Sequence, residues 1–132
     1  MNDQIKHYQD KLRYEIDSWD LYSSKDQGQP ITVIDARAKD AFKASHIPGA
    51  INLPHREMSE TTTSNLSKEI LYVTYCDGIG CNASTKGALK MSELGFQVKE
   101  LMGGLDWWIR DGYATEGQNG TPGKQSIQCG CA

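Results

Sequence analysis

The sequence predicts an α/β domain built on a mostly parallel central sheet with helices on both of its faces. Short apolar runs alternate with helical segments along the chain, which is the order that β-α-β units produce. Two of these runs, residues 31–34 and 70–75, are rich in β-branched and aromatic residues, as strands buried on both faces are. The length of 132 residues suits one domain and excludes a second full one.

Residues 1–17 are predicted to form a helical extension that precedes the domain. Apolar residues recur there and just beyond at spacings of three and four, as on one face of a helix: Ile5, Tyr8, Leu12, Ile16 and Trp19. Asp17 and Ser18 are residue types that begin helices. We therefore expect a first helix to about Tyr14 and a second from about Ser18.

The domain is expected over residues 18–113. Its first half contains the strand at 31–34, one or two helical turns at 40–45 and a short strand at 50–53. A polar stretch at 59–67, with three consecutive threonines, is predicted as loop or weak helix. This stretch leads to the second half of the sheet.

The second half contains the clearest pattern in the chain, a strand followed directly by a tight loop and a helix. The predicted elements are strand 70–75, loop 76–82, amphipathic helix 83–94, strand 96–101 and a short apolar helix at 105–109. Gly95 is expected to end the amphipathic helix, because glycine adopts the left-handed conformation at helix ends without steric cost. The carboxyl ends of such strands are where ligands gather.

The composition limits the kinds of partner that the protein is expected to bind. Charged residues make up 23% and hydrophobic ones 38%, and no apolar run approaches the ~20 residues that cross a bilayer. The formal net charge is −3, with no basic stripe for phosphate backbones. We expect a cytoplasmic protein that binds neither membrane nor nucleic acid, and whose four cysteines are reduced thiols.

Residues 114–132 are predicted to form a flexible C-terminal tail, because glycine and polar residues dominate there. The motif Cys129-Gly130-Cys131 leaves three roles open: incidental thiols, a dithiol relay, or half of a metal site. No metal site is expected, since no nearby His or Cys completes four ligands. A coil from Gly112 to Cys129 spans on the order of 20 to 25 Å, enough to reach the 76–82 loop.

Cys76 ends the best strand and begins a glycine-bearing loop that enters a helix. Loop amides and the positive end of the helix dipole both favour thiolate over thiol there. Gly78 and Gly80 are expected to supply positive φ angles, so that the amides point inward. A buried, inert cysteine before an ordinary turn fits the same local pattern, and both interpretations remain open at this point.

A wider set of motifs resembles a known family. They are Asp35-Ala36-Arg37, Phe42, His46-Ile47-Pro48-Gly49-Ala50-Ile51-Asn52-Leu53-Pro54, Tyr75-Cys76, Gly103-Gly104-Leu105-Asp106-Trp107-Trp108 and Gly112. In order and spacing they resemble the signature of rhodanese-type sulfurtransferase domains, over roughly 18–113. The resemblance implies a rhodanese-like fold without a cofactor, in which Cys76 takes sulfane sulfur from a donor as a persulfide and passes it to a thiol or protein acceptor.

The loop departs from the commonest family pattern, in which an arginine lies near the end of a six-residue loop. It resembles a variant subgroup with a Cys-Asp-Gly-x-x-Cys-Asn loop, which implies substrate contacts from Asp77, Gly78, Ile79, Gly80, Cys81 and Asn82. The charge of Asp77 would disfavour the thiosulfate dianion by about 1 kcal/mol or more. Arg56 follows a strand end and is a candidate to replace the missing loop arginine.

Cys81 has two open roles. A neighbouring thiol could attack a persulfide on Cys76 or close a disulfide with it. Alternatively, Cys81 is a small packing residue at the helix start, where Asn82 or Ser84 would be the cap.

Other motif residues are expected to be structural. Asp35, Arg37 and His46 should tie loops together by hydrogen bonds, and Trp107 and Trp108 should lie in or near the core, with one of them lining the site. The alternative function is a non-catalytic rhodanese-like binding or regulatory module. A phosphatase-like or arsenate-reductase-like enzyme is a more distant alternative, because it needs an arginine to hold its oxyanion.

Overall fold

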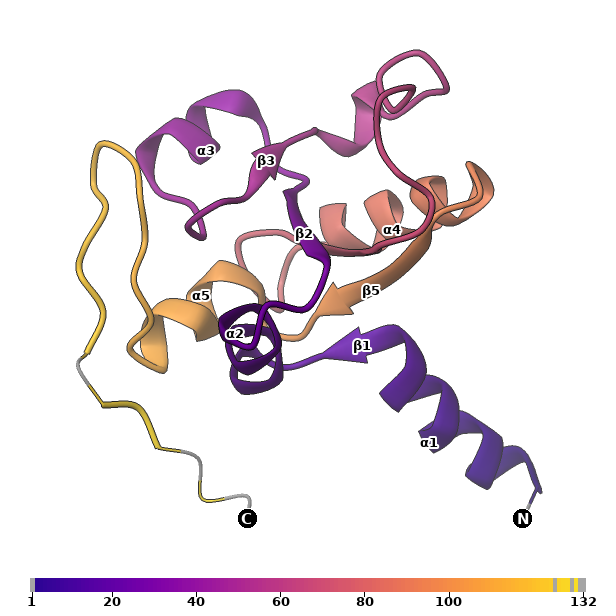
Figure 1. Cartoon of the computed structure of the whole chain (residues 1–132), viewed down its shortest axis with the longest axis horizontal. Coiled ribbons are helices and arrows are strands. Elements are labelled where there is room, and N and C mark those ends of the chain that lie inside the picture. The colour runs from indigo at the N-terminus through magenta and orange to yellow at the C-terminus, as the bar shows by residue number, and fades with distance from the viewer. Residues whose placement is uncertain (1, 125, 129, 131–132) are drawn as a thin grey trace.

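The computed structural model describes residues 2–124, 126–128 and 130. Its elements are α1 (Asn2–Tyr14), β1 (Glu15–Ile16), α2 (Ser18–Asp26), β2 (Ile31–Asp35), α3 (Lys39–Ala44), β3 (Ile51–Asn52), the 3-10 helix η1 (His55–Glu57), β4 (Leu71–Tyr75), α4 (Ala83–Glu93), β5 (Gln97–Leu101) and α5 (Gly104–Arg110). Figure 1 labels all of them except η1 and β4. The predicted alternation of strands and helices is confirmed.

The sheet has five parallel strands in the order β1-β5-β4-β2-β3. β2 and β4 lie side by side in full register, from Ile31 opposite Leu71 to Asp35 opposite Tyr75. Because both strands end at the same level, the residues that follow Asp35 and Tyr75 emerge together at one edge of the sheet. This edge carries the loop that begins at Cys76.

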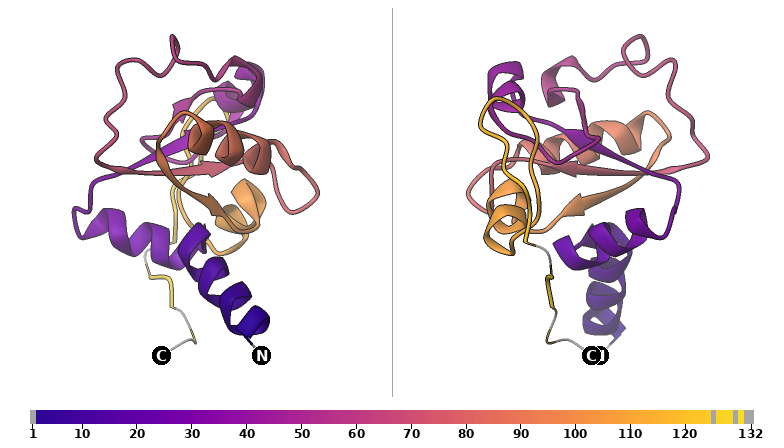
Figure 2. Two further views of the ribbon diagram at one scale, coloured as in Figure 1. Left: turned by 90° about the vertical axis from the view of Figure 1, so that its right-hand side faces the viewer. Right: turned by 60° about the vertical axis from the view of Figure 1, so that its left-hand side comes forward.

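Alternate side chains of the strands build a core on each face of the sheet. On one face Val33 joins a cluster with Leu21 of α2 and Trp108 of α5. On the other face Ile34 joins a cluster with Met91 of α4. Figure 2 shows α4 on one side of the sheet and α2 with α5 on the other, so the prediction of helices on both faces is confirmed.

The N-terminal extension is helical and breaks where the sequence predicts. Asp17 caps α2 by accepting a hydrogen bond from the backbone N–H of Asp20 at 2.8 Å. Between the helices, Glu15 and Ile16 form the two-residue strand β1 beside β5, which the sequence did not reveal because two residues carry no periodicity. α1 extends away from the sheet (Figure 1), and none of its residues is buried.

The C-terminal segment differs from the flexible tail expected from residue 114. Glu116 exchanges backbone hydrogen bonds with His46, both at 2.9 Å, and the backbone N–H of Asn119 donates to Ala44 at 2.7 Å. Thr115 is buried. Backbone hydrogen bonds hold this segment against the loop after α3, and composition gives no sign of them.

Cys129 and Cys131, the proposed relay or incidental thiols, lie outside the described residues. Across the residues that the structure does describe, every helix is too short or too polar to cross a bilayer.

Candidate active site

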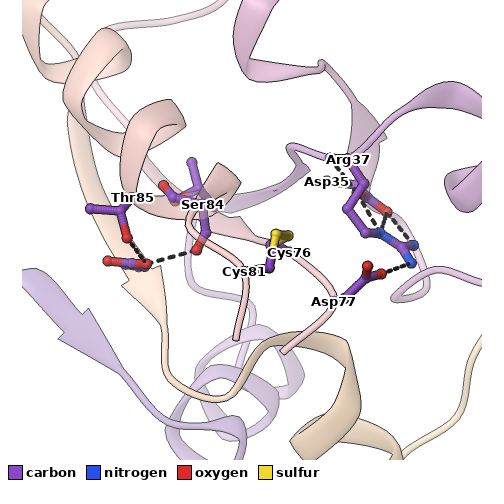
Figure 3. The surroundings of a disulfide bond; sticks show 9 residues. Asp35, Arg37, Cys76, Asp77, Cys81, Ser84 and Thr85 are labelled. Atoms are coloured by element: carbon purple, nitrogen blue, oxygen red, sulfur yellow. Dashed lines mark hydrogen bonds and ion pairs between the residues drawn. A yellow bond between two sulfur atoms is a disulfide. The ribbon is translucent and has the colours of Figure 1, made fainter. Parts of the chain in front are cut away.

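Cys76 follows the carboxyl end of the central strand β4, and the loop 77–82 leads from it to the start of α4. Figure 3 shows Cys76 beside Cys81. Cys76 is only 2% exposed. This is the strand, tight loop and helix that the sequence predicts. The loop 77–82 leads from the cysteine to the positive end of α4, a helix of eleven residues.

Cys76 and Cys81 form a disulfide, with their Cα atoms 6.2 Å apart. The expectation that all cysteines are reduced is therefore wrong for this pair. The loop turns back on itself, since the backbone N–H of Cys81 donates to the carbonyl of Gly78 at 3.2 Å, and this turn brings the second thiol to the first. Reduced thiols are expected of cytosolic proteins in general, but a turn that brings two cysteines together allows them to form a disulfide.

The glycines that need positive φ angles lie in a neighbouring loop. Gly78 and Gly80 do not adopt positive φ, contrary to expectation, whereas Gly103 and Gly104 do, at 75° and 57°. A side chain on Gly104 would collide with the carbonyl of Cys76 and the backbone of Gly78. The turn before α5 thus packs directly against the active-site loop.

The start of α5 holds the loop through its backbone. The N–H of Leu105 donates to the carbonyl of Cys76 at 2.9 Å, and the N–H of Asp106 donates to the carbonyl of Asp77 at 2.7 Å. This explains the glycine at 104, because two backbones meet there without room for a side chain, whereas a side chain on Gly103 would collide with the Trp107 ring.

Arg37 joins the end of β2 to the loop. Its guanidinium donates to Asp35 through Nε at 3.0 Å and Nη2 at 2.7 Å, and Nη1 donates to Asp77 Oδ1 at 2.9 Å. Burial opposes the charge of Arg37, but the hydrogen bonds to Asp35 and Asp77 outweigh it and raise the pKa of the guanidinium above its usual range. The structural role expected for Asp35 and Arg37 is confirmed.

The pairing with Arg37 corrects the expected electrostatics of the loop. Asp77 was expected to present an uncompensated charge, but Figure 3 shows it turned toward Arg37, away from the disulfide. The loop contains no arginine, yet an arginine from the neighbouring strand end reaches its first side chain. The Asp77 side chain remains 72% exposed, so solvent still screens this ion pair.

Tyr75 completes the buried network beside the loop. Its hydroxyl donates to Asp35 Oδ2 at 2.7 Å and accepts from the backbone N–H of Ile47 at 3.1 Å. Burial, together with the nearby carboxylate of Asp35, raises the pKa of Tyr75 above its usual range. The tyrosine is therefore a neutral bridge and a fixed support for the base of the site.

Arg56 does not lie where a replacement for the loop arginine would. It is exposed in η1, which packs against α4. Burial and the charges of Lys86, Arg56 and Lys90 lower the pKa of neighbouring His55. Arg56 thus belongs to a basic surface beside α4, and it is not among the residues that line the hollow at the loop.

An open hollow of about 810 Å³ lies beside the loop. Its wall contains the predicted residues Gly78, Ile79, Gly80, Cys81 and Asn82, whereas the predicted residues Cys76 and Asp77 do not line it. Trp107 lines it while Trp108 is buried in the core, which confirms the division expected for these two residues. Cys81 is partly exposed here, so it is the accessible end of the disulfide.

The far wall of the hollow contains residues that sequence reasoning missed. Glu100 of β5 accepts hydrogen bonds from the hydroxyls of Ser84 at 2.7 Å and Thr85 at 2.6 Å. Lys11 and Glu15 arrive from the N-terminal extension and pair with one another at 3.2 Å. No spacing signal could have found them, because these residues are far from the loop in sequence and reach it only when β5 pairs with β4 and β1 pairs with β5.

Neither cap expected at the start of α4 acts as one. Asn82 occupies the N-cap position, but its side chain makes no capping hydrogen bond. The hydroxyl of Ser84 is engaged by Glu100. Among the described residues, no group of three His, Cys, Asp or Glu side chains is arranged as metal ligands would be.

The remaining motif residues support loops, as predicted. His46 bonds through Nδ1 to the carbonyl of Phe42 at 2.8 Å and stacks on that ring. Asn52 donates to the carbonyls of Asp35 and Arg37 at 3.1 and 2.9 Å. These contacts fix the loops that follow β2 and α3.

The fold and this site define an α/β domain in which a cysteine follows the central strand of a parallel sheet. The family model described as "Rhodanese-like domain" matches residues 19–111, and the chain belongs to this family.

Solved structures share the fold. The BH2092 protein from Bacillus halodurans is 41% identical, with a TM-score of 0.86 over 96% of this chain and 93% of that one. The rhodanese-like domain of the Alr3790 protein from Anabaena sp. is 28% identical, with a TM-score of 0.69 over 89% of this chain and 91% of that one.

A curated relative is a longer protein. The HTH-type transcriptional regulator Rv0324 of Mycobacterium tuberculosis is 30% identical over 89 residues. The match takes in 67% of this chain but only 38% of the regulator's length.

Proposed function

We propose that the protein is a sulfurtransferase that carries sulfane sulfur as a persulfide on Cys76 and delivers it to a thiol or protein acceptor. One observation carries the proposal: within a rhodanese-like domain, Cys76 follows the last residue of the central strand and begins the loop that leads into α4. A sulfur at this position is a stabilised thiolate once the disulfide is reduced, and the thiolate is the nucleophile.

The reaction has two displacements after reduction of the Cys76–Cys81 disulfide. The Cys76 thiolate attacks the outer sulfur of the donor, the donor's S–S bond breaks, and the rest of the donor leaves with the electron pair. An acceptor thiolate then attacks the outer sulfur of the Cys76 persulfide, and Cys76 leaves as a thiolate. The helix dipole of α4 favours the anionic form of Cys76 before the first step and after the second.

The hollow indicates the class of donor. Ile79 is 78% exposed and Trp107 is 37% exposed, so an organic group finds apolar contacts there. The carboxylates of Glu15 and Glu100 also line the wall, against the single lining cation Lys11. A low-molecular-weight or protein persulfide therefore suits this surface better than the thiosulfate dianion.

Mass spectrometry tests the proposal. The protein is reduced, freed of reductant and exposed to glutathione persulfide, with Cys81→Ser as the principal variant and Cys76→Ser as the control. We expect the Cys76 peptide of Cys81→Ser to gain the mass of one sulfur atom, and the Cys76→Ser protein to gain none. A folded Cys81→Ser protein that stays unmodified at Cys76 would refute the sulfurtransferase function.

The regulator relative favours a second candidate, a rhodanese-like module that binds a partner without catalysis. In that case the reduced protein would take up no sulfane sulfur and Cys76→Ser would change no sulfur transfer. A phosphatase-like or arsenate-reductase-like activity is not favoured, because Arg37 is already engaged by Asp35 and Asp77 and cannot hold an oxyanion in the loop.

A further inference from the structure

The disulfide shows that the sulfur of Cys81 can bond to the sulfur of Cys76 within this fold. The loop bond from Cys81 N–H to the Gly78 carbonyl and the α5 amides on Cys76 and Asp77 set the backbone that brings them together. A persulfide on Cys76 retains this same sulfur as its inner atom. A thiol on Cys81 is therefore held near an electrophilic S–S bond, as an intramolecular nucleophile.

Building on the proposed function, we propose that Cys81 discharges the Cys76 persulfide as hydrosulfide, so that the protein acts as a persulfide reductase supplied with electrons by a dithiol. The Cys81 thiolate attacks the inner sulfur on Cys76, and the persulfide S–S bond breaks. Hydrosulfide leaves with the electron pair, and the proton of the Cys81 thiol passes to water. The sulfane sulfur gains two electrons, and the two cysteine thiols lose them as the Cys76–Cys81 disulfide forms.

The point of attack decides the product. Attack on the outer sulfur would only move the persulfide from Cys76 to Cys81, with no change in oxidation state. Attack on the inner sulfur creates the bond that the structure contains. The observed disulfide is thus the product state of the reductive route.

The difference in exposure between the two cysteines decides which sulfur an external reductant attacks. Cys76 is 2% exposed, whereas Cys81 is partly exposed and lines the hollow. A thiolate of the external dithiol therefore attacks Cys81, and Cys76 leaves as a thiolate at the start of α4. The second thiol of the reductant then displaces Cys81, which restores both thiols.

A single-turnover experiment tests the proposal. Reduced protein, freed of reductant, is mixed with an equimolar amount of glutathione persulfide, and hydrosulfide is trapped with bimane while peptide mapping follows Cys76. We expect the wild-type protein to release stoichiometric hydrosulfide and to form the Cys76–Cys81 disulfide. The Cys81→Ser variant should keep its Cys76 persulfide and release hydrosulfide at least about tenfold more slowly.

The controls separate the two proposals. Both proteins meet the same released glutathione, so slow attack by this thiol is common to them. Ser92→Ala, an exposed change on α4, controls for a substitution away from the loop. Cys81→Ala provides a second variant should serine disturb the fold. If Cys76 gains no sulfur in either Cys81 variant, the proposed function fails. If the wild-type protein keeps a Cys76 persulfide beside a free Cys81 thiol, only the reductase proposal fails.

Discussion

Arg37 is the residue through which the end of β2 and the active-site loop are joined. It is buried against Asp35, which has no solvent exposure, and it also reaches Asp77, which is largely exposed. The two ion pairs of one guanidinium therefore lie in different environments. The buried pair supports the fold, while the exposed pair adjusts the charge of the loop.

This difference predicts unequal costs of substitution. Arg37→Gln leaves the buried carboxylate of Asp35 without its cation and should lower the free energy of unfolding by about 3 to 5 kcal/mol. Asp77→Asn removes only the exposed partner and should cost about 1 kcal/mol or less. Urea denaturation measures both, and equal losses would show that the two ion pairs are not distinct in this way.

The charge of the loop also predicts a change in reactivity at Cys76. In a Cys81→Ser background, Asp77→Asn removes one negative charge from the loop and leaves Arg37 paired with Asp35 alone. The rate of Cys76 alkylation by anionic iodoacetate should rise about fivefold relative to neutral iodoacetamide, as expected for about 1 kcal/mol. The gain should shrink with added salt. An unchanged ratio at low salt would mean that Asp77 does not influence anions at Cys76.

At the scale of elements, the turn before α5 and the loop after β4 form one unit. Gly104 has a φ of 57° and lies against the carbonyl of Cys76, whereas Gly80 has open space around it and no positive φ. The amides that begin α5 then bind the carbonyls of Cys76 and Asp77. A change in this turn must therefore displace the loop that carries Cys76.

A matched pair of glycine substitutions tests this coupling. Gly104→Ala should cost at least about 1 kcal/mol of stability, through its backbone conformation and the collision with the loop. It should also slow re-formation of the Cys76–Cys81 disulfide after reduction. Gly80→Ala, inside the loop itself, should do neither. Thiol quantification over time with urea denaturation gives both readouts, and a tolerant Gly104 would contradict the packing argument.

β1 is the element that attaches the N-terminal extension. Ile16 of this strand is buried in the core, whereas Leu12 on α1 is 78% exposed. The two-residue pairing with β5 also brings Lys11 and Glu15 to the hollow. The extension thus depends on β1 for its position at the site.

Because Ile16 is buried and Leu12 is exposed, substitution by alanine should have unequal effects on stability at the two positions. Ile16→Ala should lower the free energy of unfolding by about 2 to 5 kcal/mol, because it leaves a cavity in the core. Leu12→Ala should change it by about 0.5 kcal/mol or less. Urea denaturation of both variants checks the pair, and a large loss for Leu12→Ala would mean that α1 packs on something besides solvent.

For the molecule as a whole, the disulfide closes a short loop at the edge of the sheet. Its cysteines are five residues apart, for which the chain-entropy relation gives a stabilisation of about 2 kcal/mol. Reduction should lower the urea midpoint by a corresponding amount. The double variant Cys76→Ser/Cys81→Ser should unfold at the same midpoint with and without reductant. A wild-type midpoint that reductant leaves unchanged would contradict a stabilising role.

Local patterns predicted most of the architecture, because the longer strands of the sheet are short apolar runs that can be recognised in the sequence. The position of Cys76 at a strand end followed from one such run. The Arg37–Asp77 pair could not be predicted, since its partners are forty residues apart and meet only when β2 and β4 align. The sequence leaves the Cys76–Cys81 disulfide as one of the open roles of Cys81, because residue spacing does not specify the turn that brings the two sulfurs together.

The bond between Cys81 and Cys76 has a consequence for how the Cys76 thiol withstands oxidants. An exposed thiolate that meets peroxide proceeds through sulfenic acid to sulfinic and sulfonic acids, and these last forms are lost to ordinary thiol reductants. A second thiol within bonding distance captures the sulfenic stage as a disulfide before further oxygen is added. Cys76 is then stored in a recoverable form, and a dithiol reductant that supplies two electrons cleaves the disulfide and restores both thiols.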